Sequence, residues 1–501
     1  MPLIWRKRTA TRPSSTRFYR RSSAPWQFVW ALAVWLTACQ SAVSQPPDPI
    51  LTPEQVRQDL LFLQDILDTA HVAPWLHADK KIFVRKRQRL ENQIFWPLTV
   101  SDFYASVAPL VATLNDPHTR LLPPSPPNGV RLFPLALALE RGGRALVASD
   151  ATAVPRVPIG AEVIAINDVP ISVILTKLGR YVAAETESGR RRRLQKALPL
   201  LLHQVMQLRT PFKVTWRLGY AKQQIAVDGV SYEDFMHQRW QRKAWQTFTL
   251  APNVYVLKGT HFDMPPEAFR KYCDTFFRKV IKTPNARVIL DLRDNSGGLT
   301  ENVLTLLTWL VPSKQMALPP LEIRISDVFS KWYEAKLDAI KTEKYGDYLA
   351  WLPWQFLDGW RWRLLLSDEQ QYVRYNWKLP QVAHPRYRGP LVLIANGGCF
   401  SGCVTLLDQL VRLRGSPLVG EAPGELAGGQ RALPIIRVLP NSRLRIEFPA
   451  ARLAADKPLY SLGPTNPVMT TGADLADGLD PYYETALRLL ATKVHQFADL
   501  P

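Results

Sequence analysis

The sequence predicts a multidomain protein of the α/β (α+β) class, and three observations along the chain favour it. A helical periodicity of apolar residues runs from about residue 50 to 115, short β-like runs fill about 128–228, and strand-like and helix-like segments alternate over about 229–490. The chain has 501 residues, of which 47% are hydrophobic, so it can bury several cores. A disordered or fibrous protein is therefore excluded.

The first 38 residues are typical of an export signal. They contain seven lysines and arginines, no acidic residue, and an apolar run from Trp26 to Ala38. This run is shorter than the ~20 residues that a permanent membrane span needs. It ends in Leu36-Thr37-Ala38-Cys39, which resembles a bacterial lipobox. The resemblance implies cleavage before Cys39, lipidation of its thiol and a tether over residues 39–49, although a plain signal peptide or an uncleaved anchor would also explain the run.

The formal net charge is +20, and the signal accounts for seven of these charges. A basic mature protein favours anionic neighbours, such as lipid headgroups or cell-wall polymer. The chain has no recognisable nucleic-acid motif, so nucleic acid is not an expected partner. The one dense cationic run, Arg190 to Arg193, is expected to be a solvated loop or helix face rather than a docking patch.

Three cysteines follow Cys39, namely Cys273, Cys399 and Cys403, and their spacing is not that of a zinc site. In an oxidising compartment an odd number leaves at least one free thiol or an intermolecular link. Cys399 and Cys403 flank Ser401 in the sequence. They could form a disulfide across this segment or pack there as two small buried thiols, and the sequence leaves both alternatives open.

Residues 50–125 are predicted to form a helical N-terminal domain. Thr52-Pro-Glu-Gln55 has the pattern of a capping box with proline at the first helical position, and it opens an amphipathic run to Asp68. A second helix is expected within 79–94. A third, capped by Ser101-Asp102, should reach Leu114.

Short β-like runs, such as Arg144 to Ala148, follow this helical domain. Gly160 to Asn167 resembles the G-D-x-I-x-x-I-N-G signature of PDZ domains, with Glu162 and Asp168 in place of the usual aspartate and glycine. The resemblance implies a degraded PDZ-like β domain at 128–228, in which a peptide could add as a strand to a sheet edge. The domain also contains a helix-like stretch from Leu194 to Leu208.

The chemistry is expected where two apolar runs end in glycines, at residues 288–298 and 391–401. Each run has the length of a buried strand, and its glycines leave backbone amides free to face a ligand. The second run continues into a helical segment from Gly402 to Val411, so Ser401 should lie at a strand-to-helix turn. A hydroxyl there, beside glycine amides, offers a nucleophile and donors for a developing oxyanion.

This pair of segments resembles the C-terminal processing (tail-specific) peptidase family, which pairs D-L-R-x-N-x-G-G with a later serine and then V-G-E, here Leu418 to Glu421. The resemblance implies a ClpP/crotonase-like α/β catalytic domain at 229–490 that hydrolyses proteins or peptides without a metal or organic cofactor. It also implies an acyl-enzyme on Ser401. The implied oxyanion hole uses the amides of Gly297 or Gly298 and of Gly402.

The sequence favours histidine rather than lysine as the general base. In one branch of the family a lysine follows the serine by about 25 residues, but here that position is Leu426, and no lysine lies between Ser401 and Lys457. Leu114 to Thr119 instead resembles the D-G-H-T turn in the branch of the tricorn protease core and interphotoreceptor retinoid-binding protein, which implies His118 as the base.

The third catalytic residue has no counterpart at Tyr460 to Pro467, where that branch carries an acid. An acid such as Glu421 or Asp456 is one candidate, and a slower Ser-His pair without an acid is the alternative. A noncatalytic binding protein on the same scaffold is the rival interpretation. Residues 313–388 form an insertion rich in tryptophan, expected to be a lid or a core-packing subdomain. The combined expectation is an exported serine endopeptidase, anchored by lipid at the periplasmic face of the cell envelope.

Overall fold

The computed structural model describes residues 48–152, 154–240, 243–341, 371–377, 379, 382, 384–454 and 458–492, and residues 48–501 form one compact unit. The predicted signal, Cys39 and most of the tether lie outside the described residues. So do Asp456 and four tryptophans of the insertion, Trp351, Trp354, Trp360 and Trp362. Among the described residues, no helix combines the length and apolar character that crossing a membrane requires.

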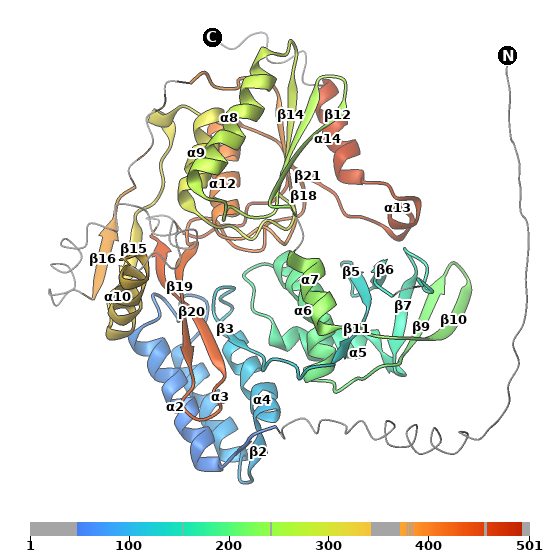
Figure 1. Cartoon of the computed structure of the whole chain (residues 1–501), viewed down its shortest axis with the longest axis vertical. Helices are drawn as coiled ribbons and strands as arrows, with labels where there is room; N and C mark the ends of the chain where they lie inside the picture. The colour runs from blue at the N-terminus through green and yellow to red at the C-terminus, as the bar shows by residue number, and fades with distance from the viewer. Residues whose placement is uncertain are drawn as a thin grey trace, which may run out of the picture. The chain divides into compact units, whose positions relative to one another are not determined.

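Three helices open the described chain, as predicted: α2 (Pro53–Thr69), α3 (Lys80–Gln93) and α4 (Val100–Ala112) (Figure 1). The capping box at the start of α2 is confirmed, because the side chains of Thr52 and Gln55 each accept a hydrogen bond from the other residue's backbone amide. A short ladder of β1 (Ile50–Leu51) and β2 (Leu98–Thr99) ties the starts of α2 and α4 together.

The predicted cap of α4 at Ser101-Asp102 is wrong by two residues. Thr99 is the cap, because its hydroxyl accepts a hydrogen bond from the amide of Asp102. Asp102 still contributes, since its carboxylate accepts a hydrogen bond from the Thr99 hydroxyl at 2.8 Å.

The three helices share their core with a sheet built largely from the C-terminal half of the chain. Its strand order is β16-β15-β20-β19, with β3 paired to β20. The strands are β3 (Arg120–Leu122), β15 (Leu321–Arg324), β16 (Tyr372–Tyr375), β19 (Arg431–Val438) and β20 (Arg445–Leu453). One buried cluster joins Leu60 and Phe103 of the helices to Ile323 and Phe448 of the sheet. The helical region is therefore not a self-contained bundle.

The described part of the tryptophan-rich insertion belongs to this same core. It contains β15, β16, a 3-10 turn η2 (Ser313–Gln315) and α10 (Asp327–Lys341). Trp332 packs against the cluster, and the Trp377 indole donates a hydrogen bond to the carbonyl of Pro319. The sequence left a lid or a core-packing subdomain as alternatives for the insertion, and the described residues pack in the core.

Residues 131–240 contain a second, antiparallel sheet of order β10-β9-β7-β6-β5, with β8 paired to β7. Its strands are β5 (Leu135–Leu139), β6 (Ala145–Asp150), β7 (Glu162–Ile166), β8 (Val169–Pro170), β9 (Phe212–Leu218) and β10 (Ala221–Val227). Around them lie β4 (Arg131–Leu132), α5 (Ile171–Leu178), η1 (Gly179–Tyr181), α6 (Glu187–Gln204), β11 (Val230–Ser231) and α7 (Tyr232–Trp240). Helix α6 begins seven residues before the predicted stretch, because Thr186 caps it through the amide of Gly189.

The third sheet has the order β12-β13-β14-β17-β18-β21, and all neighbours after β12 are parallel. Its strands are β12 (Trp245–Ala251), β13 (Val254–Gly259), β14 (Arg287–Asp291), β17 (Leu391–Ala395), β18 (Leu418–Gly420) and β21 (Asn466–Pro467). The accompanying helices are α8 (Pro266–Lys282), α9 (Thr300–Leu310), α12 (Gly402–Arg414), α13 (Gly472–Asp477) and α14 (Pro481–Thr492).

Helices cover both faces of this sheet, with α8, α9 and α12 on one side and α14 on the other (Figure 1). Leu290 of β14 packs into the first core, whereas its neighbour Ile289 packs into the second. Strands buried on both faces read as continuous apolar runs, which explains why β14 and β17 stand out in the sequence. Because the strands are parallel, their carboxyl ends meet at one edge, and the candidate site lies there.

Candidate active site

The two glycine-rich segments meet at this edge. Strands β14 and β17 are adjacent, with Val288 opposite Leu391, so the loops that follow them are neighbours. The amide of Phe400 donates a hydrogen bond to the carbonyl of Asn295 at 3.0 Å. A Cβ atom on Gly297, which has φ +87°, would lie 2.7 Å from the Ser401 Cβ. Only glycine therefore permits the first loop to approach the serine turn this closely.

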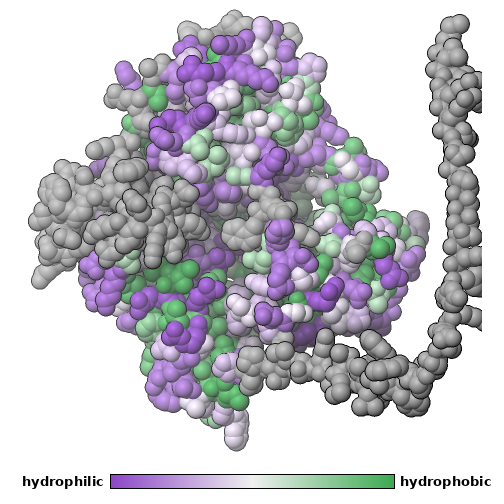
Figure 2. Space-filling view, viewed as in Figure 1, coloured by the Kyte–Doolittle hydropathy of each residue, from purple (hydrophilic) through white to green (hydrophobic). Residues whose placement is uncertain are grey.

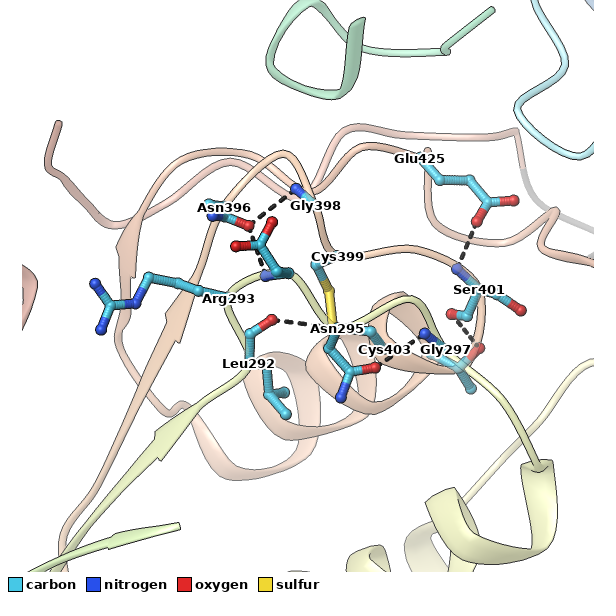
Figure 3. The surroundings of a disulfide bond; sticks show 12 residues. Leu292, Arg293, Asn295, Gly297, Asn396, Gly398, Cys399, Ser401, Cys403 and Glu425 are labelled. Carbon is cyan, nitrogen blue, oxygen red and sulfur yellow. Dashed lines mark hydrogen bonds between the residues drawn. A yellow bond between two sulfur atoms is a disulfide. The ribbon is translucent and has the colours of Figure 1, made fainter. Parts of the chain in front are cut away.

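Ser401 lies at the predicted turn, between β17 and α12, and α12 ends at Gly415 in the left-handed conformation. Its own backbone has φ 52° and ψ −122°, which is strained for a residue with a side chain. A disulfide between Cys399 and Cys403 spans the turn, as Figure 3 shows, and this decides between the two alternatives for the cysteine pair. Cys273 remains a buried free thiol, as an odd number of cysteines requires.

Glu425 joins the serine turn to His118. One of its carboxylate oxygens accepts a hydrogen bond from the Ser401 backbone amide at 2.7 Å (Figure 3), and the other lies 3.1 Å from Nε2 of His118. The Glu425 side chain is fully buried, whereas that of His118 is 21% exposed. A buried carboxylate with two hydrogen-bond donors holds both neighbours in fixed positions.

His118 reaches the site because its turn leads directly into β3. That strand pairs with β20, and Leu122 faces Arg445 in the register. The His118 amide donates to the Asp116 carboxylate at 2.9 Å, which fixes the turn. Among the described side chains, His118 and Ser401 share no direct hydrogen bond, and the Ser401 hydroxyl instead faces the carbonyl of Arg431 at 3.5 Å.

Electrostatics favour the protonated form of His118. Burial opposes its charge, but attraction and the hydrogen bond to Glu425, with a further contribution from Asp116, outweigh burial and raise its pKa. If Nε2–H donates to Glu425, then Nδ1 is the nitrogen left to accept a proton in the neutral imidazole.

Arg431, at the start of β19, is a fully buried cation surrounded by carboxylates. Its guanidinium pairs with Glu185, lies 3.3 Å from Asp116 and lies 3.8 Å from Glu425. Burial alone would raise the pKa of Asp116, but Arg431 and the hydrogen bond of His71 hold this pKa well below its usual range. The pKa of Glu185 is also lowered, against burial, by the hydrogen bond of His77 and the charge of Arg431. Arg431 thus keeps buried acids ionised beside the site.

Two of the three predicted oxyanion donors remain available. The Gly297 amide already donates to the Asn295 side chain at 2.9 Å, so it is not free in this arrangement. The amides of Gly298 and Gly402 make no hydrogen bond to the described residues. A Cβ on Gly402 would lie 3.7 Å from the Gly298 nitrogen, so these two amides lie near each other and near Ser401.

The arginine run at residues 190–193 is not a solvated face, and that expectation is wrong. These side chains lie in the first half of α6 and contact the site loops. Arg190 bonds to Asn115, Arg191 to Glu421, Arg192 to Asp294, and Arg193 to the Pro117 carbonyl. Arg193 also stacks over the Phe400 ring at 4.7 Å. The run therefore ties α6 to the loops on both sides of Ser401.

Glu421, one candidate for the third catalytic residue, pairs with Arg191 rather than with His118. The acid beside His118 is Glu425, which the sequence reasoning missed. A signal was present, because Glu425 directly precedes Leu426, the position where a related peptidase would carry its lysine.

Within the described part of the chain, neither a metal-binding cluster nor the cavity beside the site loops competes with this centre. The described residues contain no group of three or more His, Cys, Asp or Glu side chains placed to hold a metal ion. A cavity of about 410 Å³ at the same sheet edge is lined by Asp294, Asn396 and Glu421, among others, but not by Ser401. Ion pairs of Arg191 and Arg192 occupy its wall, so it is a neighbouring space and not the catalytic centre.

Solved structures of other proteins are similar to this chain in fold. A crystal structure of a CPAF mutant overlays with a TM-score of 0.64 at 14% identity and covers 90% of this chain and 99% of that chain. Mature CPAF complexed with lactacystin overlays with a TM-score of 0.59 at 13% identity, and the overlay covers 88% of this chain and 98% of that chain. The photosystem II D1 C-terminal processing protease overlays with a TM-score of 0.40 at 13% identity, and the overlay covers 83% of this chain and 94% of that chain.

No curated protein matches the chain significantly by sequence. The CPAF overlays, at their low identity, establish a shared mixed α/β fold. Residues 255–457 match the profile of Peptidase family S41, and this span contains both glycine-rich loops, Ser401 and Glu425. The expectations of a C-terminal processing type family and of a serine-type peptidase are thereby confirmed for residues 255–457, which match Peptidase family S41.

Proposed function

We propose that this protein is an endopeptidase that hydrolyses peptide bonds of protein or peptide substrates through an acyl-enzyme on Ser401, with His118 as general base. The observation that carries the proposal is the single carboxylate of Glu425, bonded to the Ser401 amide and to the His118 imidazole. Such a carboxylate orients the imidazole and stabilises the imidazolium that forms during catalysis. Glu425 takes the place of the acid that is missing near the C-terminus.

The reaction follows from these positions. The Ser401 hydroxyl attacks the scissile carbonyl carbon while His118 takes the hydroxyl proton on Nδ1, which requires the two side chains to come within hydrogen-bond distance of each other. The amides of Gly298 and Gly402 receive the oxyanion of the tetrahedral intermediate. His118 then gives its proton to the leaving amine, and a water molecule, deprotonated by His118, releases the acyl group from Ser401.

A covalent probe tests the nucleophile directly. The folded parent protein is incubated with a fluorophosphonate, or with lactacystin, with which mature CPAF was complexed. Mass spectrometry should locate one adduct on the peptide that contains Ser401, and Ser401→Ala should remove it. A folded parent that accepts neither reagent and cleaves no peptide would instead support the noncatalytic binding protein.

We further propose that the protein is exported and anchored by lipid at Cys39, on the periplasmic face of the cell envelope. Support comes from the sequence alone: the basic first segment, the short apolar run and the lipobox-like Leu36 to Cys39. The chains of a bacterial lipoprotein give a stable attachment, whereas one acyl chain would give only a marginal one.

We also assign a PDZ-like role to residues 128–228, that of presenting a substrate segment to the catalytic domain. Strand β5 is at the end of its sheet and packs beside α6, the helix that carries the arginine run. A sheet edge beside a helix suits the addition of an extended peptide as a further strand. The neighbouring site loops, held by Arg192 and Arg193, would then lie close to the bound segment.

A further inference from the structure

Helix α3 has an unusual charge distribution. Six of its fourteen residues are lysine or arginine, and its one acid is Glu91. Lys80 pairs with Asp68, and Arg87 is buried and pairs with Glu91. The other four, Lys81, Arg85, Lys86 and Arg89, are exposed and have no ion pair within the described part of the chain.

These four cations repel one another along the helix. Lys81 and Arg85 are four residues apart, as are Arg85 and Arg89, so their side chains are neighbours on the side opposite the buried Phe83 and Arg87. Like charges at this spacing destabilise a helix. An anionic partner would remove the repulsion, and the described residues supply none.

Two exposed aromatic side chains follow the same helix. Phe95 is 73% exposed and Trp96 is 80% exposed, in the segment between α3 and β2. Strand β2 pairs with β1, where Ile50 is a further exposed apolar residue at 68%. β1 begins only eleven residues after Cys39 in the sequence, so the aromatic pair is close to the point where the chain leaves its N-terminal segment.

We propose that Lys81, Arg85, Lys86, Arg89, Phe95 and Trp96 form a membrane-docking patch that binds an anionic lipid bilayer. The patch belongs to α3 and to the segment between α3 and β2, and both elements lie at the bottom of Figure 1. In the same view, Figure 2 shows hydrophobic and hydrophilic residues side by side in this region. Tryptophan and phenylalanine fit the headgroup region of a bilayer, and nearby lysines and arginines bind its anionic lipids. A soluble polyanion would use the cations but would gain little from the aromatic pair.

The patch goes beyond the proposed peptidase function and does not depend on it. A lipid on Cys39 would hold the protein near a bilayer without fixing its orientation. The patch would add a second contact close to the tether, and this contact would fix the orientation that the lipid leaves free. The S41 domain would then work at a fixed orientation above the surface.

Hydrogen exchange on the full chain tests the proposal. The Cys39→Ser protein, which cannot be lipidated, is mixed with vesicles of phosphatidylcholine alone or with 30% phosphatidylglycerol. Residues 80–99 should gain protection only with the anionic vesicles, and high salt should remove it. Binding through the apolar run at residues 26–38 would leave residues 80–99 unprotected with either lipid.

Two variants separate the parts of the patch. Lys81→Gln, Arg85→Gln, Lys86→Gln and Arg89→Gln together should raise the lipid concentration for half protection roughly several hundredfold, since each cation contributes about fivefold. Phe95→Ser with Trp96→Ser should weaken protection while leaving its salt dependence intact. If the aromatic variant binds like the parent, a bilayer is not the partner.

A matched control removes the same charge elsewhere. Lys271→Gln, Arg278→Gln, Lys279→Gln and Lys282→Gln lie on α8, where these side chains are also exposed. This variant should bind anionic vesicles almost as the parent does. An equal loss of binding in both quadruple variants would show that overall charge, and not the patch, attracts the lipid, and the proposal would fail. Circular dichroism of each variant should show the helix content of the parent.

Discussion

His118 Nε2 lies 3.1 Å from a carboxylate oxygen of Glu425, although 307 positions separate the two residues in the sequence. The contact exists because β3 pairs with β20, which brings the His118 turn beside the loop after β18. The second oxygen of Glu425 holds the Ser401 amide. The positions of the candidate base and nucleophile are therefore coupled through one buried group, and a change at Glu425 should affect both.

Ser401→Ala should abolish peptide hydrolysis and leave the fold intact. The hydroxyl is partly exposed at a turn held by the disulfide and by the Glu425 contact to the backbone, so its loss should change the free energy of unfolding by no more than about 0.5 kcal/mol. Loss of a nucleophile typically lowers kcat by roughly 10⁶-fold. Cleavage of a fluorogenic peptide and thermal unfolding measure the two effects. Ser106→Ala, on α4, is the matched control and should keep full activity.

Activity should rise with pH through the pKa of His118. Glu425 and Asp116 raise this pKa above its ordinary 6.5, and only the neutral imidazole can accept the serine proton. Glu425→Gln removes the negative charge that favours the imidazolium, so the acidic limb of the kcat/KM profile should move to lower pH. The same change should lower kcat by about 10²- to 10⁴-fold, because the amide orients the imidazole poorly.

The pH profiles of the two glutamate variants distinguish this role from general charge effects. Glu421→Gln removes a nearby carboxylate that pairs with Arg191 instead of His118, so its acidic limb should coincide with that of the parent. If the acidic limb of the Glu425→Gln profile also coincides with that of the parent, Glu425 does not orient the base.

Cys39→Ser should prevent lipidation, so that cells either release the protein from the membrane fraction or accumulate its longer precursor. The expectation rests on the lipobox-like Leu36 to Cys39, because the thiol is the acceptor of the lipid. Fractionation and the mass of the N-terminal peptide measure the outcome. Ser44→Ala, in the same segment, should mature like the parent. A Cys39→Ser protein that also matures and fractionates like the parent would identify an ordinary signal.

Much of the third sheet could be predicted because its central strands are buried on both faces. The runs at β14 and β17 are continuously apolar, and each breaks into glycines that only a close approach of two loops explains. Ser401 and the helix after it could be placed for the same reason. The edge strand β12 was missed, because only its first residue is buried and the next four are exposed, which leaves no such run.

The charged part of the site could not be predicted from local pattern. An arginine run that pairs with Asp294 and Glu421 reads in sequence like a solvated helix, because its partners lie far along the chain. Glu425 likewise gains its role only from the pairing of β3 with β20. Such contacts depend on tertiary structure, and neither helical periodicity nor strand length encodes them.

Arg431→Met should destabilise the protein by about 3–5 kcal/mol at pH 7, because it leaves buried carboxylates without their cation. In the parent, Asp116 and Glu185 have lowered pKa values, so their contribution to stability is present above the pKa of the unfolded chain and is lost only as pH falls through the lower folded values. In the variant, Arg431 no longer offsets the effect of burial on Asp116 and Glu185. The pKa of both carboxyls in the folded protein should therefore rise. The stability deficit should therefore be largest near pH 7 and shrink as pH falls toward about 4.

Urea unfolding of Arg431→Met and its parent across this pH range measures the deficit. Arg445→Met is the matched control, since Arg445 is exposed on β20 of the same sheet, and it should stay within about 0.5 kcal/mol of the parent at every pH. A deficit in Arg431→Met that stays constant from pH 7 to pH 4 would reflect lost packing alone. In that case the buried acids beside His118 would not depend on Arg431 for their charge, and the electrostatic account of this site would be wrong.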